Sequence, residues 1–167
     1  MYAVISVIYT KSQLNPTLLR VRDMNIGKKV TQMLSDYFIL TFEQIPSGTA
    51  QMKRYDGRSG HFFKSARLQQ TENIYMSALA QYRPEEPSEL PIALSLEFRY
   101  SAKSKKLRGT WKTSRPDVDN IAKLLIDCMT KSGFWKDDSQ IVRLTLEKNY
   151  SEKELAEIVV TWREVVE

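Results

Sequence analysis

The chain has 167 residues, of which 42% are hydrophobic and 27% charged, and its net charge is +5 at pH 7. This composition excludes an intrinsically disordered chain and a membrane protein, and the length allows one domain with a hydrophobic core. The only cysteine, Cys128, excludes an internal disulfide, and the only histidine, His61, has no companion for a zinc site. We therefore expect a cytoplasmic protein whose positive charge favours an acidic partner such as nucleic acid.

The N-terminal part of the chain is predicted to begin and end with a strand. Residues 1–9 are rich in Val, Ile and Tyr, and they lack both the basic start of a signal peptide and the length of a membrane span. A short helix is predicted over residues 27–36. A strand is predicted over residues 37–43, and it ends at the turn residues 45–48.

The middle of the chain is predicted to form a loop, a helix and a strand. The glycines and scattered charges of residues 53–60 predict a mobile loop. Apolar side chains recur from about residue 64 to residue 81, which predicts a helix stopped by Pro84 and Pro87. Residues 91–100 alternate between apolar and small or polar side chains, as a strand buried on one face does.

The clearest helical pattern follows Pro116. Apolar side chains recur with helical spacing from Ile121 to Met129, and Gly133 follows in the position that helix C-termini favour. Residues 140–148 and 155–162 are predicted as two strands joined in a hairpin. The order of elements predicts an α+β fold, in which helices pack on one face of a mixed sheet.

Positive charge is concentrated in residues 99–115, which are predicted to form a loop. This segment has seven cations and no acid, so the rest of the chain has a net charge of −2. Such a loop favours contact with a polyanion, and the alternative is a solvated lysine-rich loop. Trp111 lies within it and is interpreted either as a base-stacking residue or as an anchor packed on the domain. The cations that follow Arg99 are Lys103, Lys105, Lys106, Arg108, Lys112 and Arg115.

Acidic residues begin where the basic segment ends. Asp117 and Asp119 flank Val118 at the start of the helix, and residues two apart in an extended backbone point the same way. Both carboxylates can therefore face one cation such as Mg²⁺, which prefers oxygen ligands. The alternative is that Asp117 caps the helix, where its negative charge is favoured.

A second acidic pair, Asp137 and Asp138, follows the same helix. A helix of about fourteen residues is roughly 20 Å long, so the two pairs cannot meet along it. The chain must therefore reverse after Gly133, and this reversal predicts that Asp138 lies near Asp119. The alternative is a solvated turn.

Lys123 lies on the polar face of the helix, four residues from both Asp119 and Asp127. This spacing allows a ladder of salt bridges. It also allows the ammonium group to reach a scissile phosphate or an attacking water, where charge develops in a transition state. The spacing alone does not choose between these roles.

These residues resemble the RusA family of Holliday junction resolvases, which are metal-dependent endonucleases common in phages and prophages. The resemblance rests on D-x-D-N-x-x-K at residues 117–123, on Asp127, and on G-x-x-x-D-D-x-Q-[IV]-V at residues 133–142. Weaker similarity covers residues 37–163. We expect residues 37–167 to form the RusA-like nuclease domain and residues 1–36 to be an N-terminal extension of the same domain.

The resemblance implies a homodimer that binds a four-way DNA junction and cuts two strands symmetrically in DNA recombination and repair. It implies that Asp117, Asp119 and Asp138 bind Mg²⁺, that Lys123 is catalytic and that Asp137 is a helper. The cations of the basic segment from Lys103 to Arg115 would contact DNA phosphates. The alternatives are a nuclease for other branched DNA, such as forks or flaps, and a non-catalytic nucleic-acid-binding module.

Overall fold

The computed structural model describes residues 36–48, 53–57 and 60–166. The predicted strand over residues 1–9 lies outside these ranges, as does the predicted helix over residues 27–36 except for its last residue. The strands are β1 (Asp36–Phe42), β2 (Lys53–Asp56), β3 (His61–Lys64), β4 (Ile92–Tyr100), β5 (Ile141–Tyr150) and β6 (Ala156–Glu164). The α-helices are α1 (Ala66–Leu79) and α2 (Val118–Lys131), and two short 3₁₀ helices are η2 (Lys105–Leu107) and η3 (Asp138–Gln140).

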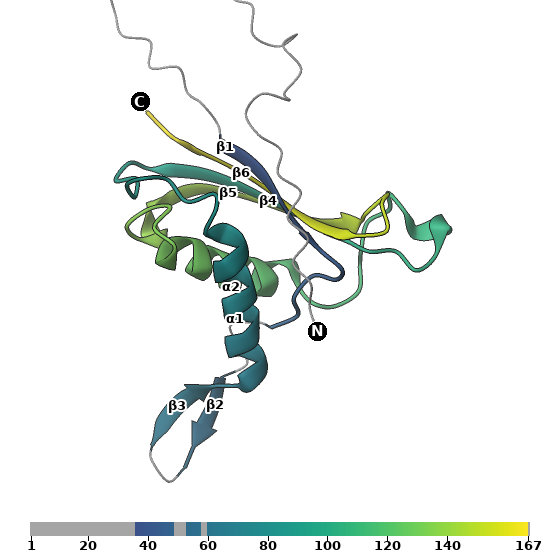
Figure 1. Ribbon diagram of the computed structural model, residues 1–167, viewed down its shortest axis with the longest axis horizontal. Coiled ribbons are helices and arrows are strands. Elements are labelled where there is room, and N and C mark those ends of the chain that lie inside the picture. Colours follow the sequence, from purple (N-terminus) through teal and green to yellow (C-terminus); the bar gives the residue numbers. More distant parts are fainter. Residues whose placement is uncertain (1–35, 49–52, 58–59, 167) are drawn as a thin grey trace, which may run out of the picture.

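The main sheet has four strands in the order β1-β6-β4-β5. β4 pairs in parallel with β5, whereas the β1–β6 and β4–β6 pairs are antiparallel. The predicted α+β class with a mixed sheet is therefore confirmed, and α1 and α2 lie on the same side of the sheet (Figure 1). Within the described residues, no helix is long and apolar enough to cross a membrane.

The predicted hairpin of the last two strands is wrong, because β4 lies between β5 and β6. β4 buries every second side chain from Ile92 to Phe98, and residues 156–160 of β6 are all buried. These two strands therefore take the centre of the sheet, whereas β5, none of whose side chains is fully buried, is an edge strand. The short link between β5 and β6 crosses one intervening strand, a span of about 10 Å.

The predicted mobile loop over residues 53–60 is also wrong. Residues 53–56 form β2, which pairs antiparallel with β3, and Gly60 has a positive φ of 69° in the turn that precedes β3. The error arose because residues 53–60 were interpreted without their pairing partner, residues 61–64. This two-stranded sheet extends away from the main sheet, beyond the end of α1 (Figure 1).

The hydrophobic core lies between the helices and the main sheet. α2 contributes the apolar face that was predicted, and its side chains at Ile121, Leu124, Leu125 and Cys128 are at most 1% exposed. Aromatic rings continue this core beyond the helix, where the ring of Trp135 lies 6.0 Å from Phe134 and 6.1 Å from Trp162. Burial of this stripe fixes the rotation of α2 about its axis, and it thereby decides which α2 side chains face solvent.

Glu72 of α1 connects three elements through two ion pairs. Its carboxylate lies 2.6 Å from the Lys64 ammonium at the end of β3 and 3.1 Å from the Lys131 ammonium at the end of α2. Burial raises the pKa of Glu72, but the hydrogen bonds and charges of the two lysines outweigh it, so the net pKa is lowered.

A carboxyl group with a lowered pKa in the folded state stabilises the fold above its unfolded pKa, and this contribution disappears as the pH falls through the folded pKa. We expect Glu72→Gln to cost about 1 kcal/mol in the free energy of unfolding at pH 7. The cost should shrink towards zero as the pH falls below about 4.5 and through the lowered pKa of Glu72, as measured by urea denaturation at each pH. Glu85→Gln, at an exposed position, is the control; an equal cost at every pH would contradict the prediction.

Candidate functional site

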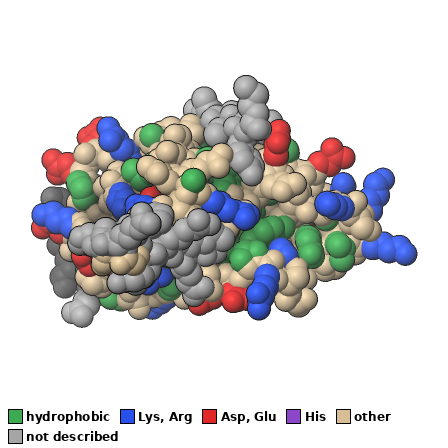
Figure 2. Space-filling model, turned by 90° about the horizontal axis from the view of Figure 1, so that it is seen from below, with side chains coloured by type: hydrophobic (Ala, Val, Ile, Leu, Met, Phe, Trp, Pro, Cys, Tyr) green, Lys and Arg blue, Asp and Glu red, His purple; other side chains and the backbone are tan. Residues whose placement is uncertain are grey.

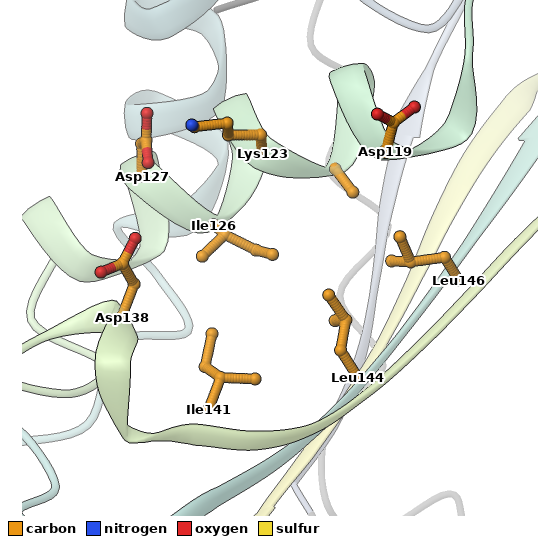
Figure 3. Close-up of a pocket in the computed structure, with 9 residues that line it drawn as sticks. Asp119, Lys123, Ile126, Asp127, Asp138, Ile141, Leu144 and Leu146 are labelled. Atoms are coloured by element: carbon orange, nitrogen blue, oxygen red, sulfur yellow. The ribbon is translucent and has the colours of Figure 1, made fainter.

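A hollow of about 340 Å³ lies between α2 and β5 (Figure 3). One side of it is charged and the other is apolar. The charged side chains are Asp119, Lys123, Asp127 and Asp138, and the apolar ones are Ala122, Ile126, Ile141, Leu144 and Leu146.

α2 supplies three of the charged side chains at a spacing of four residues. Asp119, Lys123 and Asp127 therefore lie on one face of the helix, because four residues are slightly more than one turn. The apolar stripe of the same helix is buried in the core, which leaves this face to line the hollow. Figure 3 shows the Lys123 ammonium on the side of Asp127.

Asp138 reaches the hollow through the predicted chain reversal. Gly133 turns the chain with a φ of 82°, a conformation that L side chains rarely adopt. The next two residues are buried, and the Trp135 indole NH donates a hydrogen bond of 2.8 Å to Thr130 Oγ1 of α2. Asp138 then begins η3, directly before β5.

The reversal places Asp138 beside Asp127 and not beside Asp119. Figure 3 shows Asp138 pointing towards α2 next to Asp127, with Asp119 at the other end of the hollow. The pKa of Asp127 is raised, mainly by burial and also by the negative charge of Asp138. Asp127 was absent from the predicted site, although its spacing of four residues from Lys123 placed it on the same helix face.

Asp117 occupies the N-cap position of α2, but its side chain makes no capping hydrogen bond. It does not line the hollow. α2 begins at Val118, so Asp119 already belongs to the helix, and the expected extended alternation of the two aspartates does not occur. The charge of Asp117 acts on Lys148: burial and the charge of Lys112 lower the pKa of Lys148, and the negative charge of Asp117 opposes this effect.

Asp137 acts as a cap on η3. Its Oδ1 accepts a hydrogen bond of 2.9 Å from the Ser139 amide, and its own amide donates one of 2.9 Å to Gln140 Oε1. The hydrogen bonds from Ser139 lower the pKa of Asp137. This carboxylate lies outside the hollow.

The basic loop, residues 101–116, extends beyond the end of the main sheet (Figure 1). Figure 2 shows Lys and Arg side chains projecting at this end of the molecule. The cations at 103, 105, 106 and 115 are exposed, whereas Arg108 and Lys112 are partly buried. Arg108 lies 3.9 Å from the Glu154 carboxylate.

Lys112 stabilises the basic loop through hydrogen bonds to residues of the same loop. Its ammonium donates hydrogen bonds to Ser114 Oγ, to the Ser114 carbonyl at 3.3 Å and to the Arg115 carbonyl at 3.0 Å. It also lies 4.9 Å above the centre of the Tyr100 ring. Lys148 donates to the Ser114 carbonyl at 2.9 Å and to the Pro116 carbonyl at 2.6 Å. Two lysines therefore hold the backbone that leads into α2.

The donor chemistry of the hollow fits a hard divalent cation. In the described parts of the chain, no group of three or more His, Cys, Asp or Glu side chains could hold a metal ion by itself. Mg²⁺ does not require such a cage, because it commonly uses one or two carboxylates together with waters and substrate phosphates. The neighbouring carboxylates of Asp127 and Asp138 offer this kind of partial site.

Much of this chain is similar to known proteins. A family model described as Endodeoxyribonuclease RusA matches residues 43–161, a range that includes both acidic pairs and the basic loop. A Lactococcus phage r1t protein named crossover junction endodeoxyribonuclease rusA is 46% identical over 94 residues, which cover 54% of this chain and 72% of the phage protein. YqaN of Bacillus subtilis (strain 168), an uncharacterised protein, is 35% identical over 71 residues, which cover 42% of this chain and 49% of YqaN. The chain therefore belongs to the RusA family of endodeoxyribonucleases.

Proposed function

We propose that this protein is a Mg²⁺-dependent, structure-selective endonuclease that resolves Holliday junctions in DNA recombination and repair. The observation that carries the proposal is a hollow in which carboxylates and a lysine gather, in a chain whose family has endodeoxyribonuclease activity. The relative from Lactococcus phage r1t is named as a crossover junction enzyme. The basic loop supplies the charge that branched DNA, with several phosphate backbones close together, would attract.

The carboxylates have the role of holding the cation. We propose Asp127 and Asp138, which are neighbours in the hollow, as the direct ligands of the cation. Asp119, which the sequence also predicts as a ligand, lies at the other end of the hollow and would share the cation through waters or the substrate phosphate. Asp117 stays in the set because its carboxylate is not used to cap α2. The cation, when bound, supplies a water of lowered pKa and neutralises charge on the phosphate. Asp137 is assigned a supporting role, because its hydrogen bonds shape the turn that carries Asp138.

Lys123 is proposed to stabilise the negative charge that develops on the phosphate during cleavage. Its position supports this role, because it lines the hollow between Asp119 and Asp127 on the solvent-facing side of α2. An ammonium group is a suitable partner for phosphate oxygens, since it is a compact point charge with three donors on a flexible stem. Lys123 would therefore bind and orient the scissile phosphate.

Symmetric cutting of a junction requires two active sites, and we propose a homodimer for this reason. The exposed edge strand β5 supports the proposal, since Val142 on it is 63% exposed and does not line the hollow. A strand edge with an exposed large apolar side chain is a surface that proteins usually cover. Sedimentation equilibrium measures the oligomeric state directly, and a monomer at micromolar concentration would contradict this part of the proposal.

The deciding experiment is cleavage of a substrate panel: a four-way junction, a replication fork, a flap and a linear duplex, each with Mg²⁺ or with EDTA. Paired symmetric nicks in the junction are expected with Mg²⁺ and none with EDTA. Faster cutting of forks or flaps would assign the enzyme to other branched DNA. Binding of the junction without cutting of any substrate would identify a non-catalytic nucleic-acid-binding module.

The basic loop leads to a separate prediction. Replacing both Lys105 and Lys106 by alanine is expected to weaken junction binding, because two exposed cations are lost. It should also flatten the plot of log Kd against log salt by about 2, since each phosphate contact contributes roughly 0.9. Fluorescence anisotropy at several salt concentrations measures both effects. Arg83→Ala, an exposed cation after α1, is the control, and an unchanged slope in the double variant would remove these lysines from the interface.

A further inference from the structure

Trp111 is a large apolar side chain that is exposed to solvent. Its exposed fraction of 67% is the highest among the exposed large apolar side chains of the described residues. Among the described residues, no ring contact or hydrogen bond engages its indole. The interpretation of Trp111 as an anchor packed on the domain therefore does not hold.

The backbone around Trp111 is ordered although its side chain is exposed. The Gly109 amide donates to the Tyr150 carbonyl at 2.9 Å, the Tyr150 amide donates to the Thr110 carbonyl at 2.9 Å, and the Lys112 amide donates to the Lys148 carbonyl at 3.1 Å. Trp111 itself forms an antiparallel bridge with Asn149. The loop is thus held to the end of β5 by an isolated β-bridge and three backbone hydrogen bonds, and the indole extends from this paired backbone.

The loop that carries the indole has several cations and no acid of its own, and the acids that lie against it, Glu152 and Glu154, are beside Gly109 and Arg108. Lys103, Lys105, Lys106 and Arg115 are exposed on the basic loop, and Leu107, 41% exposed, is the other exposed large apolar side chain there. Cations next to an exposed aromatic ring form the combination that binds unpaired nucleic acid, in which the cations contact the backbone and the ring stacks on a base. A fully paired duplex does not offer a free base face, whereas an opened branch point does.

The loop also connects Trp111 to the start of α2. Asp117, the N-cap of α2, is six positions after Trp111, which limits the distance between their Cα atoms to about 20 Å. Between them, the ammonium groups of Lys112 and Lys148 hold the carbonyls of Ser114, Arg115 and Pro116. A base stacked on Trp111 would therefore be held at a defined position relative to the start of α2.

We infer that Trp111 is a specificity-determining residue that stacks on an unpaired base at the branch point of the DNA substrate. This inference rests on the proposed function, since it assumes a branched DNA substrate. It assigns selection of the branch to the indole and general attraction of DNA to the neighbouring cations. Trp111 acts in substrate recognition and is not a catalytic residue.

Tryptophan fluorescence provides a direct test in EDTA, where metal-dependent cutting is blocked. The other tryptophans, Trp135 and Trp162, are 1% and 6% exposed, so DNA that stacks on Trp111 should quench the emission of Trp111 selectively. The four-way junction and single-stranded DNA are expected to quench the emission of the wild-type protein, and the paired duplex much less. Trp111→Phe removes the responsive fluorophore and should abolish the quenching. Equal quenching by the wild-type protein and Trp111→Phe, or none by either, would overturn the inference.

Dissociation constants provide a second test. Trp111→Ala should raise the Kd for the junction by about 10-fold, whereas Trp111→Phe should keep it within about 3-fold of the wild-type value because phenylalanine retains an aromatic face. Neither substitution should change the Kd for linear duplex. Equal weakening on junction and duplex, unchanged junction affinity in Trp111→Ala, or a changed oligomeric state in sedimentation would each overturn the inference. Failure of the proposed function appears separately, as a wild-type protein that does not cut the junction with Mg²⁺.

Discussion

Asp138→Asn is expected to lower the rate of junction cleavage by at least about 100-fold while junction binding is retained. The substitution keeps the shape of the side chain but removes the negative charge that would hold the cation. Asp138 is exposed, so the change should leave the free energy of unfolding nearly unaltered. Single-turnover cleavage with Mg²⁺ measures the first effect, and gel shift in EDTA measures binding.

The neighbouring residue offers a matched control. Asp137→Asn makes the same change of charge one position earlier, at a residue that caps η3 and lies outside the hollow. Asparagine caps a helix about as well as aspartate, so this variant should cut within about 3-fold of the wild-type rate. Asp119→Asn and Asp127→Asn, on the α2 side of the hollow, should behave like Asp138→Asn. Cleavage at the wild-type rate by Asp138→Asn, or an equal loss in Asp137→Asn, would contradict the assignment of the metal site.

Trp135→Ala is expected to cost about 3–5 kcal/mol in the free energy of unfolding, which is a large share of the stability of a domain of this size. Trp135 is 1% exposed, and its ring lies 6.0 Å from Phe134 and 6.1 Å from Trp162. Its loss would open a cavity and would also remove the hydrogen bond to Thr130 that holds the reversal against α2. Urea denaturation followed by circular dichroism measures the cost.

Two variants make this result specific. Trp111→Ala removes the same side chain from an exposed position and should change the free energy of unfolding by no more than about 0.5 kcal/mol. Trp135→Phe keeps a ring in the core and should recover most of the lost stability. A cost below 1 kcal/mol for Trp135→Ala would show that the buried turn does not depend on this side chain.

Local patterns were sufficient for the elements whose side chains alone select their structure. The apolar stripe from Ile121 to Met129 predicted α2, because helical spacing brings these side chains onto one face. The alternation over residues 91–100 predicted β4 for the corresponding reason in a strand. The length of α2 predicted the reversal after Gly133, but the neighbour that it predicted for Asp138 was wrong, because Asp138 lies beside Asp127 and not beside Asp119.

Strand neighbours could not be predicted in this way. Backbone hydrogen bonds between strands are the same for nearly every residue, so β5 and β6 were assigned to each other because they are consecutive in the chain. In the structure β4 separates them, because burial of β4 and β6 on the inside of the sheet outweighs proximity in sequence. The hairpin of β2 and β3 was missed for a related reason, since strands of four residues are too short to show a pattern in the sequence and become evident only from their pairing.

Residue types and spacing were enough to identify the acidic pairs, Lys123 and the basic segment as candidates for the proposed chemistry, because these patterns do not depend on how the strands are arranged. Which of these side chains meet depends on the tertiary structure. It brought Asp127 beside Asp138, left Asp117 outside the hollow, used Lys112 to hold the loop and exposed Trp111. The physical reason is that contacts between distant residues depend on how the core packs, and burial of the α2 stripe and of the Phe134–Trp135 turn sets the directions of the polar side chains between them.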